Sequence, residues 1–445
     1  MSHTYMANGF DPQSRPELEA EDLALLDRRQ GVLGAANRLF YERPVRVVRG
    51  SGVLLYDAAG NDYLDAYNNV PVVGHGNPRV AQAVGDQLRV LNTHTRYLTD
   101  DVVAYAERLT ALFRHPLSQV MFACSGSEAV DLALRVAAHV TGRNGIIVSA
   151  HAYHGTTRAT AEVSPSLGAN NPIPAHVALM DVPDPLRDDP ATAAADFERR
   201  IDDAVRLLEA RGHAPGALLL DSVLSSDGLR PAPTAFLERA AAAIRRAGGL
   251  YIADEVQTGF GRTGAQWWGF AHYPVEPDMV VLGKPMGNGM PISAVIGRPD
   301  VFDRFGRDVR YFNTFAAGSA AVAAATAVLD ELEERDLLAS ATKVGGRLAS
   351  ELRAITADDP RVAEVRATGL FLAVEIVAPG PDRAADAGLA RQIVNGMRDR
   401  RVLISASGQN ENVLKIRPPL VFAEEHIDRL CAAFADALAA TARPA

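Results

Sequence analysis

The sequence predicts an α/β protein in which a large domain holds a mostly parallel sheet and a smaller α+β domain is built from both ends of the chain. Three observations predict this: short apolar runs in the middle of the chain, helical patterns between them, and flanks of a different character. The 445 residues also exceed one ordinary domain. We place an N-terminal segment at 1–75, a large domain at 76–325 and a small domain at 326–445, with the first joining the third.

The large domain is expected to hold its strands at short, continuous apolar runs. Helical patterns such as Ser127–Thr141 and Pro233–Ala247 separate these runs. Because strands covered on both faces are apolar throughout, this order indicates a parallel sheet between two layers of helices. The stretch 164–195, rich in Pro and Ala, is expected to be a loop. The runs are Gln119–Ala123, Ile146–Ser149, Ala217–Asp221, Leu250–Asp254, Met279–Gly283 and Ile292–Gly297.

The two flanks show other patterns. A helix is expected from about residue 20, and Gly and Asn-Asp then punctuate alternating strands over Gly50–Asp65. One long helical pattern covers Ala321–Ile355, and another helix is expected at the end of the chain. Between these two helices we expect strand, helix, strand and strand at Leu370–Val377, Ala385–Arg400, Val402–Ser405 and Val413–Ile416.

Composition narrows the class of protein. The net charge of −9 and the lack of a basic run argue against a nucleic-acid surface. Two cysteines, Cys124 and Cys431, are too few for a disulfide framework. Residues 1–15 lack the order of a signal peptide, and no apolar run approaches the ~20 residues that span a bilayer. We expect a cytoplasmic protein without a membrane or nucleic-acid partner.

A lysine and an aspartate stand at the ends of two predicted strands. Asp254 ends Leu250–Asp254, and Lys284 directly follows Met279–Gly283. The carboxyl ends of parallel strands meet at the edge of a sheet where ligands bind, so both side chains are expected in one crevice. A lysine there forms a Schiff base once its pKa is lowered, and pyridoxal phosphate (PLP) needs an acid at its pyridine nitrogen. Either residue alone is more often a buried salt bridge or a cap, whereas the pair favours PLP.

The predicted strand Gln119–Ala123 is followed by Cys124-Ser-Gly-Ser-Glu128, which opens a helix. Small residues let backbone N–H groups approach an anion, and the helix dipole favours its charge. Gly126 and Ser127 are therefore candidates for the PLP phosphate, although serine at such a position is also an ordinary N-cap. Thr314 is a second candidate for the phosphate.

An aromatic residue follows another strand, in His151-Ala-Tyr153-His154-Gly155. Such a ring stacks on a planar cofactor, so Tyr153 and His154 are candidates for cofactor binding. The two histidines lack the helical context and the third ligand of a metal site, and we expect no metal. Gly259–Gly264 matches G-x-G-x-x-G but does not directly follow its strand, and the next residues do not open a helix. We therefore do not expect a dinucleotide site there.

Together these residues resemble the class III, fold type I, PLP-dependent aminotransferases over about Tyr41 to Leu438. The strongest pieces are Ser125–Ala129, Asp254–Gln257 with Gly259–Gly264, and Gly283–Pro285. The resemblance implies a seven-stranded sheet and a homodimer with active sites at its interface, and it leaves a tetramer open. It also implies cofactor contacts. These are Lys284 as the Schiff base, Asp254 at the pyridine nitrogen, Gln257 at the ring hydroxyl, Tyr153 on the ring, Gly126 and Ser127 at the phosphate, and Thr314 reaching it from the partner subunit.

Several motifs resemble one branch of that family, which includes phospho-lyases and alanine–glyoxylate-type aminotransferases. They are Asn68–Val70, Asn92–Tyr97, Lys284–Gly289 and Val413–Pro419. Many family members hold the substrate carboxylate with an arginine and gate that arginine with a glutamate. In this chain these positions resemble Lys415 and Ser226. The family's acid-Pro pair is Asp221-Ser222, and its Gly-Gly-Asn-Pro is Ala316–Ser319.

Lys415, Arg417 and Asn68 are the candidate substrate-binding residues. A lysine binds a carboxylate or a phosphate as a point charge, without the bidentate fork of arginine. The principal hypothesis is transfer of an amino group from an amine or amino acid to a 2-oxo acid or aldehyde. The alternative is elimination of phosphate from an O-phospho amine such as phosphoethanolamine or phosphohydroxylysine. A non-catalytic PLP-binding protein is disfavoured, because the lysine is present and no DNA-binding domain is apparent.

Overall fold

The computed structural model describes residues 8–11, 13, 18–184, 186, 188–189, 191–230 and 235–441. Its central feature is a seven-stranded sheet in the order β4-β10-β9-β8-β7-β5-β6. β10 runs antiparallel to both of its neighbours, and the other described pairs of this sheet are parallel. The predicted mostly parallel sheet is therefore confirmed. The strands are β4 (Gln119–Ala123), β5 (Gly145–Ser149), β6 (Val177–Met180), β7 (Pro215–Asp221), β8 (Leu250–Asp254), β9 (Met279–Leu282) and β10 (Ser293–Gly297).

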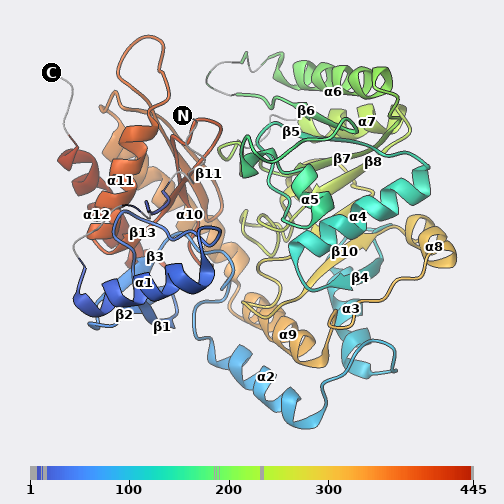
Figure 1. Ribbon diagram of the computed structural model, residues 1–445, viewed down its shortest axis with the longest axis horizontal. Helices are drawn as coiled ribbons and strands as arrows, with labels where there is room; N and C mark the ends of the chain where they lie inside the picture. The colour runs from blue at the N-terminus through green and yellow to red at the C-terminus, as the bar shows by residue number, and fades with distance from the viewer. Residues whose placement is uncertain are drawn as a thin grey trace.

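Helices cover both faces of this central sheet (Figure 1). Successive strand residues point to opposite faces, so Ile252 packs in the cluster that contains α4, whereas Tyr251 packs in the cluster that contains α6 and α7. Residues on both faces are buried, which explains the continuous apolar runs. The helices of this part are α2 (Pro78–Val90), α3 (Asp100–Ala111), α4 (Gly126–Thr141), α5 (Arg158–Glu162), α6 (Ala193–Ala210), α7 (Phe236–Arg246) and α8 (Pro299–Asp308).

Two four-stranded sheets lie beside the central one. The first, β1-β2-β3-β13, joins β1 (Val47–Ser51), β2 (Leu54–Asp57) and β3 (Asp62–Asp65) to β13 (Val402–Leu403) from the other end of the chain. The β3–β13 pair is parallel, so the blue and red segments lie side by side in Figure 1. The second sheet, β11-β12-β15-β14, consists of β11 (Val362–Thr368), β12 (Phe371–Ile376), β15 (Val413–Ile416) and β14 (Ser405–Ser407).

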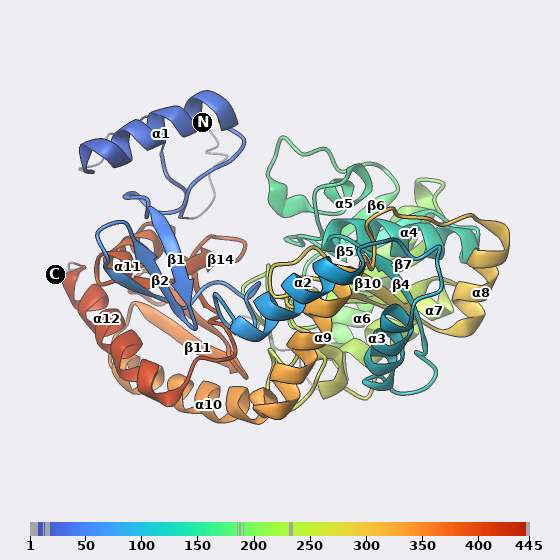
Figure 2. The ribbon, with the colours of Figure 1, turned by 90° about the horizontal axis from the view of Figure 1, so that it is seen from below.

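Five further helices complete the described fold. α9 (Ser319–Glu334) and α10 (Leu337–Thr356) follow one another from the central sheet to the smaller sheets along the lower edge of Figure 2. α11 (Ala387–Asp399) and α12 (Ile427–Ala440) pack on each other, and α1 (Ala20–Leu33) lies near the N-terminus. Short 3₁₀ helices occupy Pro165–Leu167, Gly269–His272 and Glu424–His426. No helix in the described ranges is both long and apolar enough to cross a membrane.

Some expectations were wrong in detail. The stretch 164–195, expected to be a loop, contains β6 and the first residues of α6. The single helix expected over Ala321–Ile355 is two helices, because the chain turns at Asp336, whose φ is +46°. The strand expected at Val402–Ser405 is divided between β13 and β14, which belong to different sheets. Pro233, the expected start of one helix, lies outside the described residues, and α7 begins at Phe236.

Candidate active site

Three polar residues meet where the central strands end. Asp221 and Asp254 are the last residues of β7 and β8 and lie opposite each other in register. Lys284 follows the end of β9, which pairs with β8. Because the three strands are parallel neighbours, their carboxyl ends form one edge of the sheet, as ligand sites in α/β proteins do.

A cavity of about 220 Å³ opens at this edge. It gathers most of the residues predicted from sequence to bind the cofactor, together with three residues to which the sequence had assigned no role. Those predicted are Gly126, Ser127, Tyr153, His154, Asp254, Gln257 and Lys284, and the additional ones are Gly155, Asp221 and Val256.

Asp254 is held as a buried carboxylate. Its Oδ2 lies 2.6 Å from His154 Nδ1, and its Oδ1 accepts a hydrogen bond of 3.0 Å from the backbone N–H of Val256. The side chains of His154 and Asp254 are 2% and 7% exposed. Both carboxylate oxygens therefore have a polar partner, as a buried carboxyl group requires. His154 Nε2 is buried without a hydrogen-bond partner among the described residues.

Lys284 enters the same cavity. Its Nζ lies 5.9 Å from the centroid of the Tyr153 ring. Burial, reinforced by the positive charge of Arg417, lowers the pKa of Lys284 to about 8, against the opposite effect of Asp254 and Asp221. A lysine with such a pKa has a substantial neutral fraction near neutral pH, which is the form that attacks a carbonyl group.

The first turn of α4 faces the cavity with small residues. Ser125 is the N-cap, since its side chain accepts a hydrogen bond of 3.2 Å from the backbone N–H of Glu128. Gly126 and Ser127 therefore stand in the first turn, where backbone N–H groups lack helical acceptors and favour an anion. Gly155 has a φ of +139°, and a Cβ on it would come within 2.4 Å of Ser127 Oγ, so only glycine fits this approach.

Two basic residues of the smaller sheet approach from the other side. Lys415, on β15, and Arg417, just after it, are 8% and 4% exposed. Lys415 Nζ and the Arg417 guanidinium lie 5.5 and 5.6 Å from the centroid of the same ring, Phe371. Arg417 also donates hydrogen bonds to Gln257 Oε1, at the cavity wall, and to the carbonyl oxygen of Tyr67 at 3.2 Å. Both basic groups therefore lie beside the cavity.

Like Lys415 and Arg417, the candidates Asn68 and Thr314 are not among the residues that line the cavity. The side chain of Asn68 accepts a hydrogen bond of 3.2 Å from the backbone N–H of Val70, within its own loop. Thr314 is exposed, and the described cavity does not include it.

Sequence reasoning gave no role to several buried polar groups around the cavity. Asp227 is bonded by Ser149 Oγ at 2.8 Å, and burial raises its pKa to about 6. Glu255 is fully buried and accepts hydrogen bonds from Ser222, Thr258, Gly269 and Phe270 at 2.5–2.8 Å. Burial raises its pKa to about 7. The only sequence signal for Glu255 was its place beside Asp254 at a strand end.

The glycine-rich motif Gly259–Gly264 connects the large domain to the sheet that contains β12 and β15 through hydrogen bonds. It forms turns after β8, and its Arg262 is fully buried and donates a hydrogen bond of 3.0 Å to the carbonyl oxygen of Leu370. A second hydrogen bond reaches the carbonyl oxygen of Pro418. Arg262 thus links the loop after β8 to the segments that precede β12 and follow β15.

The fold and this cavity define a PLP-dependent enzyme of fold type I. The family model described as Aminotransferase class-III matches residues 38–438, and the chain belongs to this family. The predicted family, fold class and cofactor are thereby confirmed.

Among curated relatives, the alanine–glyoxylate aminotransferase 2-like protein of Drosophila melanogaster is 37% identical, over 92% of this chain and 85% of that protein. The ethanolamine-phosphate phospho-lyase homolog 1 of Caenorhabditis elegans is 33% identical, over 96% and 97%. Among solved structures, a phospholyase from Arthrobacter in complex with phosphoethanolamine is 43% identical, with a TM-score of 0.91 over 94% of this chain and 100% of that one. A PLP-bound amine transaminase from an uncultivated Pseudomonas species is 28% identical, with a TM-score of 0.82 over 89% and 95%.

The residues present fit PLP. The buried Asp254 carboxylate supplies the acid that a pyridine nitrogen requires, Tyr153 supplies a ring, and the first turn of α4 supplies N–H groups for a phosphate. Lys284 supplies an amine whose pKa is already lowered. No group of three or more His, Cys, Asp and Glu side chains that would hold a metal ion occurs among the residues that the structure describes.

Proposed function

We propose that this enzyme eliminates phosphate from an O-phospho amine, with phosphoethanolamine as the simplest substrate. In balance, phosphoethanolamine and water give acetaldehyde, ammonia and phosphate. The observation that carries this proposal is the pair Lys415 and Arg417, which are buried beside the cavity and form no ion pair with any carboxylate in the described ranges. Two basic groups without an acidic partner suit a dianionic phosphate.

In the proposed reaction, different residues of the chain bind the cofactor, transfer the proton and bind the phosphate. Bound PLP supplies an electron sink for the carbon that bears the amine. Asp254 would pair with the pyridine nitrogen, and His154, which lies 2.6 Å from Asp254 Oδ2, would hold that carboxylate in place. Lys284 Nζ takes the proton from the substrate carbon beside the amine and later returns a proton, as a group with a pKa near 8 does efficiently. Lys415 and Arg417 hold the phosphate before and during its departure.

The position of the family's gating glutamate supports the same reaction. That position resembles Ser226, which is half-buried and brings no negative charge. A transaminase that accepts both a charged and an uncharged side chain must cover and uncover its cationic site, whereas a lyase with one phosphorylated substrate needs a cationic site that stays open. The 43% identity to a phospholyase solved with phosphoethanolamine points the same way.

Transamination, the principal hypothesis from sequence, is the second candidate. The family match and the 37% identity to an alanine–glyoxylate aminotransferase 2-like protein favour it. Lys415 and Arg417 would then hold a substrate carboxylate. The same Lys284 and Asp254 serve both reactions, so the cavity around them does not separate the two.

The test is a comparison of substrates at steady state. Purified holoenzyme is given phosphoethanolamine or phosphohydroxylysine alone, and phosphate and ammonia are measured. In parallel it is given alanine with glyoxylate, and pyruvate is measured. The proposal expects kcat/KM for an O-phospho amine to exceed that for the alanine–glyoxylate pair by at least about 100-fold, a difference of about 3 kcal/mol. The opposite order assigns the enzyme to transamination.

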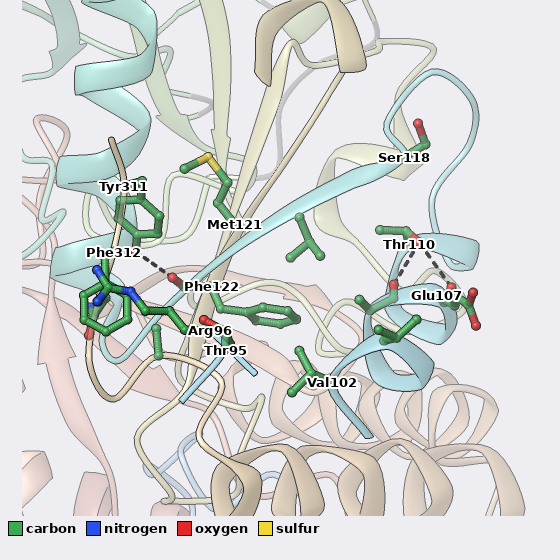
Figure 3. Close-up of a pocket in the computed structure, with 15 residues that line it drawn as sticks. Thr95, Arg96, Val102, Glu107, Thr110, Ser118, Met121, Phe122, Tyr311 and Phe312 are labelled. Atoms are coloured by element: carbon green, nitrogen blue, oxygen red, sulfur yellow. Dashed lines mark hydrogen bonds between the residues drawn. The ribbon is translucent and has the colours of Figure 1, made fainter. Parts of the chain in front are cut away.

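We also propose a homodimer, with the second copy covering the pocket whose lining residues are drawn in Figure 3. A cavity of about 540 Å³ lies between α3, β4 and residues 311–316, and Arg96 stacks 3.6 Å over the Phe312 ring at its rim. Leu98 and Phe315, near this cavity in sequence, are 97% and 78% exposed. Large apolar side chains so exposed usually mark an interaction surface. Thr314 lies next to Phe315, as expected of a residue that serves the partner's site.

The proposal also includes the domain boundaries and the cellular location expected from the sequence. A division of the chain at residues 75 and 325 is supported by the sheets, because β1–β3 pair with β13 and not with the central sheet. A cytoplasmic location is supported by Cys124 and Cys431, which are both free thiols, as is usual in a reducing compartment.

A further inference from the structure

Lysine is scarce in this protein, and its placement is informative. Of the 45 Lys and Arg side chains, three are lysines: Lys284, Lys343 and Lys415. Lys343 is on the surface, where its side chain is 77% exposed and pairs with Glu424. The other two lie at the active site. Arginine stays charged in proteins, whereas lysine loses its proton when it is buried, so a lysine at position 415 provides a group whose charge is able to change.

Lys415 has no partner for its charge. It is 8% exposed, and its Nζ contacts the face of Phe371 at 5.5 Å from the ring centroid. Its Nζ makes no hydrogen bond or ion pair with another described residue. A buried ammonium ion without a hydrogen-bonded partner is costly, and such a group usually releases its proton.

The charged groups around Lys415 come from four elements. Arg417 lies just after the end of the same strand, and Lys284 approaches from the end of β9. Asp221 and Asp227, from the end of β7 and the loop after it, are the acids that act on it. The remaining acid is Glu375, which lies on the same face of the adjacent β12 because Ala373 is opposite Lys415.

Asp221, Asp227 and Glu375 all accept hydrogen bonds from donors other than Lys415. Asp221 accepts hydrogen bonds from Ser225 Oγ and from the backbone N–H of Val223, the latter at 2.9 Å. Asp227 accepts from Ser149, and Glu375 pairs with Arg366 at 2.6 Å. None of them makes an ion pair with Lys415. Burial, followed by repulsion from Arg417, therefore holds the pKa of Lys415 well below its ordinary value, and Asp221 and Asp227 only partly oppose this.

We propose that Lys415 is uncharged in the substrate-free holoenzyme and takes up one proton from solvent when the anionic group of a substrate binds beside Arg417. The proton adds to the Nζ lone pair, and the bound anion becomes the missing counter-ion. The site thus acquires its second positive charge only with an anion present. This inference rests on the proposed function for the identity of the anion, which is a phosphate monoester, but the proton uptake applies equally to a carboxylate.

Protonation of Lys415 only when an anion binds would favour anionic substrates over uncharged ones. A neutral Lys415 avoids the repulsion between two buried cations, its own ammonium group and the Arg417 guanidinium, in the substrate-free site. An anion that enters is matched by a new ion pair, whereas an uncharged substrate of the same shape gains nothing. Proton uptake linked to binding also makes anion affinity depend on pH, with Kd rising about tenfold per pH unit between the pKa values of free and bound Lys415.

The test is calorimetric titration of the PLP-loaded holoenzyme with ethyl phosphate at pH 8, in phosphate-free buffers of different ionisation enthalpy. Ethyl phosphate has no amine, so it does not react with the cofactor. Its second pKa is about 6, so it is already a dianion at this pH. The slope of binding enthalpy against buffer ionisation enthalpy gives the number of protons taken up. Propionate in a second titration represents a carboxylate.

The wild type is expected to take up about one proton, as linkage requires for a lysine that goes from neutral to charged. Lys415→Arg should still bind ethyl phosphate but take up no proton, and Lys415→Met should bind it at least about tenfold more weakly. Lys343→Arg, the matched surface control, should behave as wild type. Folding of each variant is checked by the visible absorbance of bound PLP and by thermal unfolding.

Zero uptake in the wild type, or the same uptake in Lys415→Arg, would overturn the inference. A direct check uses the protein labelled with ¹³Cε-lysine, in which the signal absent from Lys415→Arg should titrate at lower pH without ethyl phosphate than with it. An unchanged titration would overturn the inference equally. If only propionate binds and the uptake is seen with it, the proposed phosphate substrate is wrong while the role of Lys415 stands. Uptake with ethyl phosphate supports both.

Discussion

Replacing Asp254 by asparagine removes one charge from the site and leaves its shape. The wild-type carboxylate lies 2.6 Å from His154 Nδ1, with both side chains buried, and its other oxygen accepts the N–H of Val256 at 3.0 Å. An asparagine oxygen retains the second of these contacts. Removing one preorganised charge-stabilising group from an active site costs about 3–4 kcal/mol. In the proposed reaction this carboxylate would stabilise the protonated pyridine nitrogen of PLP, so most of this cost should appear in turnover.

At about 1.4 kcal/mol for each factor of ten, this cost corresponds to a loss of about 10²–10³-fold in kcat/KM. The assay is steady-state turnover of the best substrate, with PLP occupancy measured by visible absorbance in the same samples. His154→Gln is the matched variant, because it removes the histidine contact but keeps the carboxylate, and it should lose only about tenfold. The reasoning fails if Asp254→Asn at full occupancy stays within tenfold of wild type, or if His154→Gln loses as much as Asp254→Asn.

Three other predictions concern attachment of the cofactor, the frame of the site and the dimer. The rate at which PLP attaches to apoenzyme through Lys284 should rise about fivefold from pH 7 to 8 and about twofold from pH 8 to 9. The reason is that only the neutral amine attacks, and the pKa of Lys284 is about 8. A rate that does not change with pH, or any attachment in Lys284→Ala, contradicts this. Arg366→Ala should lower the free energy of unfolding in urea by about 3–5 kcal/mol. Arg366 is buried, pairs with Glu375 and donates hydrogen bonds to the carbonyl oxygens of Gly228 and Leu229. An unchanged urea midpoint would contradict this stabilising role of Arg366. Leu98→Asp should convert the dimer to monomers in analytical ultracentrifugation, since Leu98 is 97% exposed in one chain and buried in the proposed interface; a dimer of wild-type stability places the interface elsewhere.

The parts predicted well from sequence are those with strong local signals. Continuous apolar runs located β4, β5, β7, β8, β9 and β10 to within about two residues, because these strands are buried on both faces. The edge strand β6 was missed, since only Val177–Met180 is involved and prolines flank it on both sides. The break between α9 and α10 was missed because neither glycine nor proline marks it, and Asp336 takes a left-handed φ that the tertiary structure imposes.

Within the site as well, residues with a local sequence signal were predicted and residues that depend on tertiary contacts were not. Strand ends and a helix start predicted that Asp254, Lys284 and Gly126 lie together, and the structure places all three at one cavity, since a parallel sheet brings such positions to one edge. Asp227 gave no local signal, because its loop approaches the cavity only after β7 has been placed in the sheet. The proximity of Lys415 and Arg417 to Phe371 likewise depends on the pairing of β12 with β15. Contacts between distant segments of this kind are not apparent in a single sequence.

The most direct test of the proposed reaction is the amount of phosphate released per active site. PLP-loaded enzyme is mixed with excess phosphoethanolamine and no 2-oxo acid, and phosphate is followed over time together with the cofactor spectrum. The account predicts continuous release of many equivalents of phosphate, with equal ammonia and acetaldehyde, while the PLP spectrum persists. Conversion of the cofactor to its pyridoxamine form after one turnover, without phosphate release, would contradict the account and establish transamination.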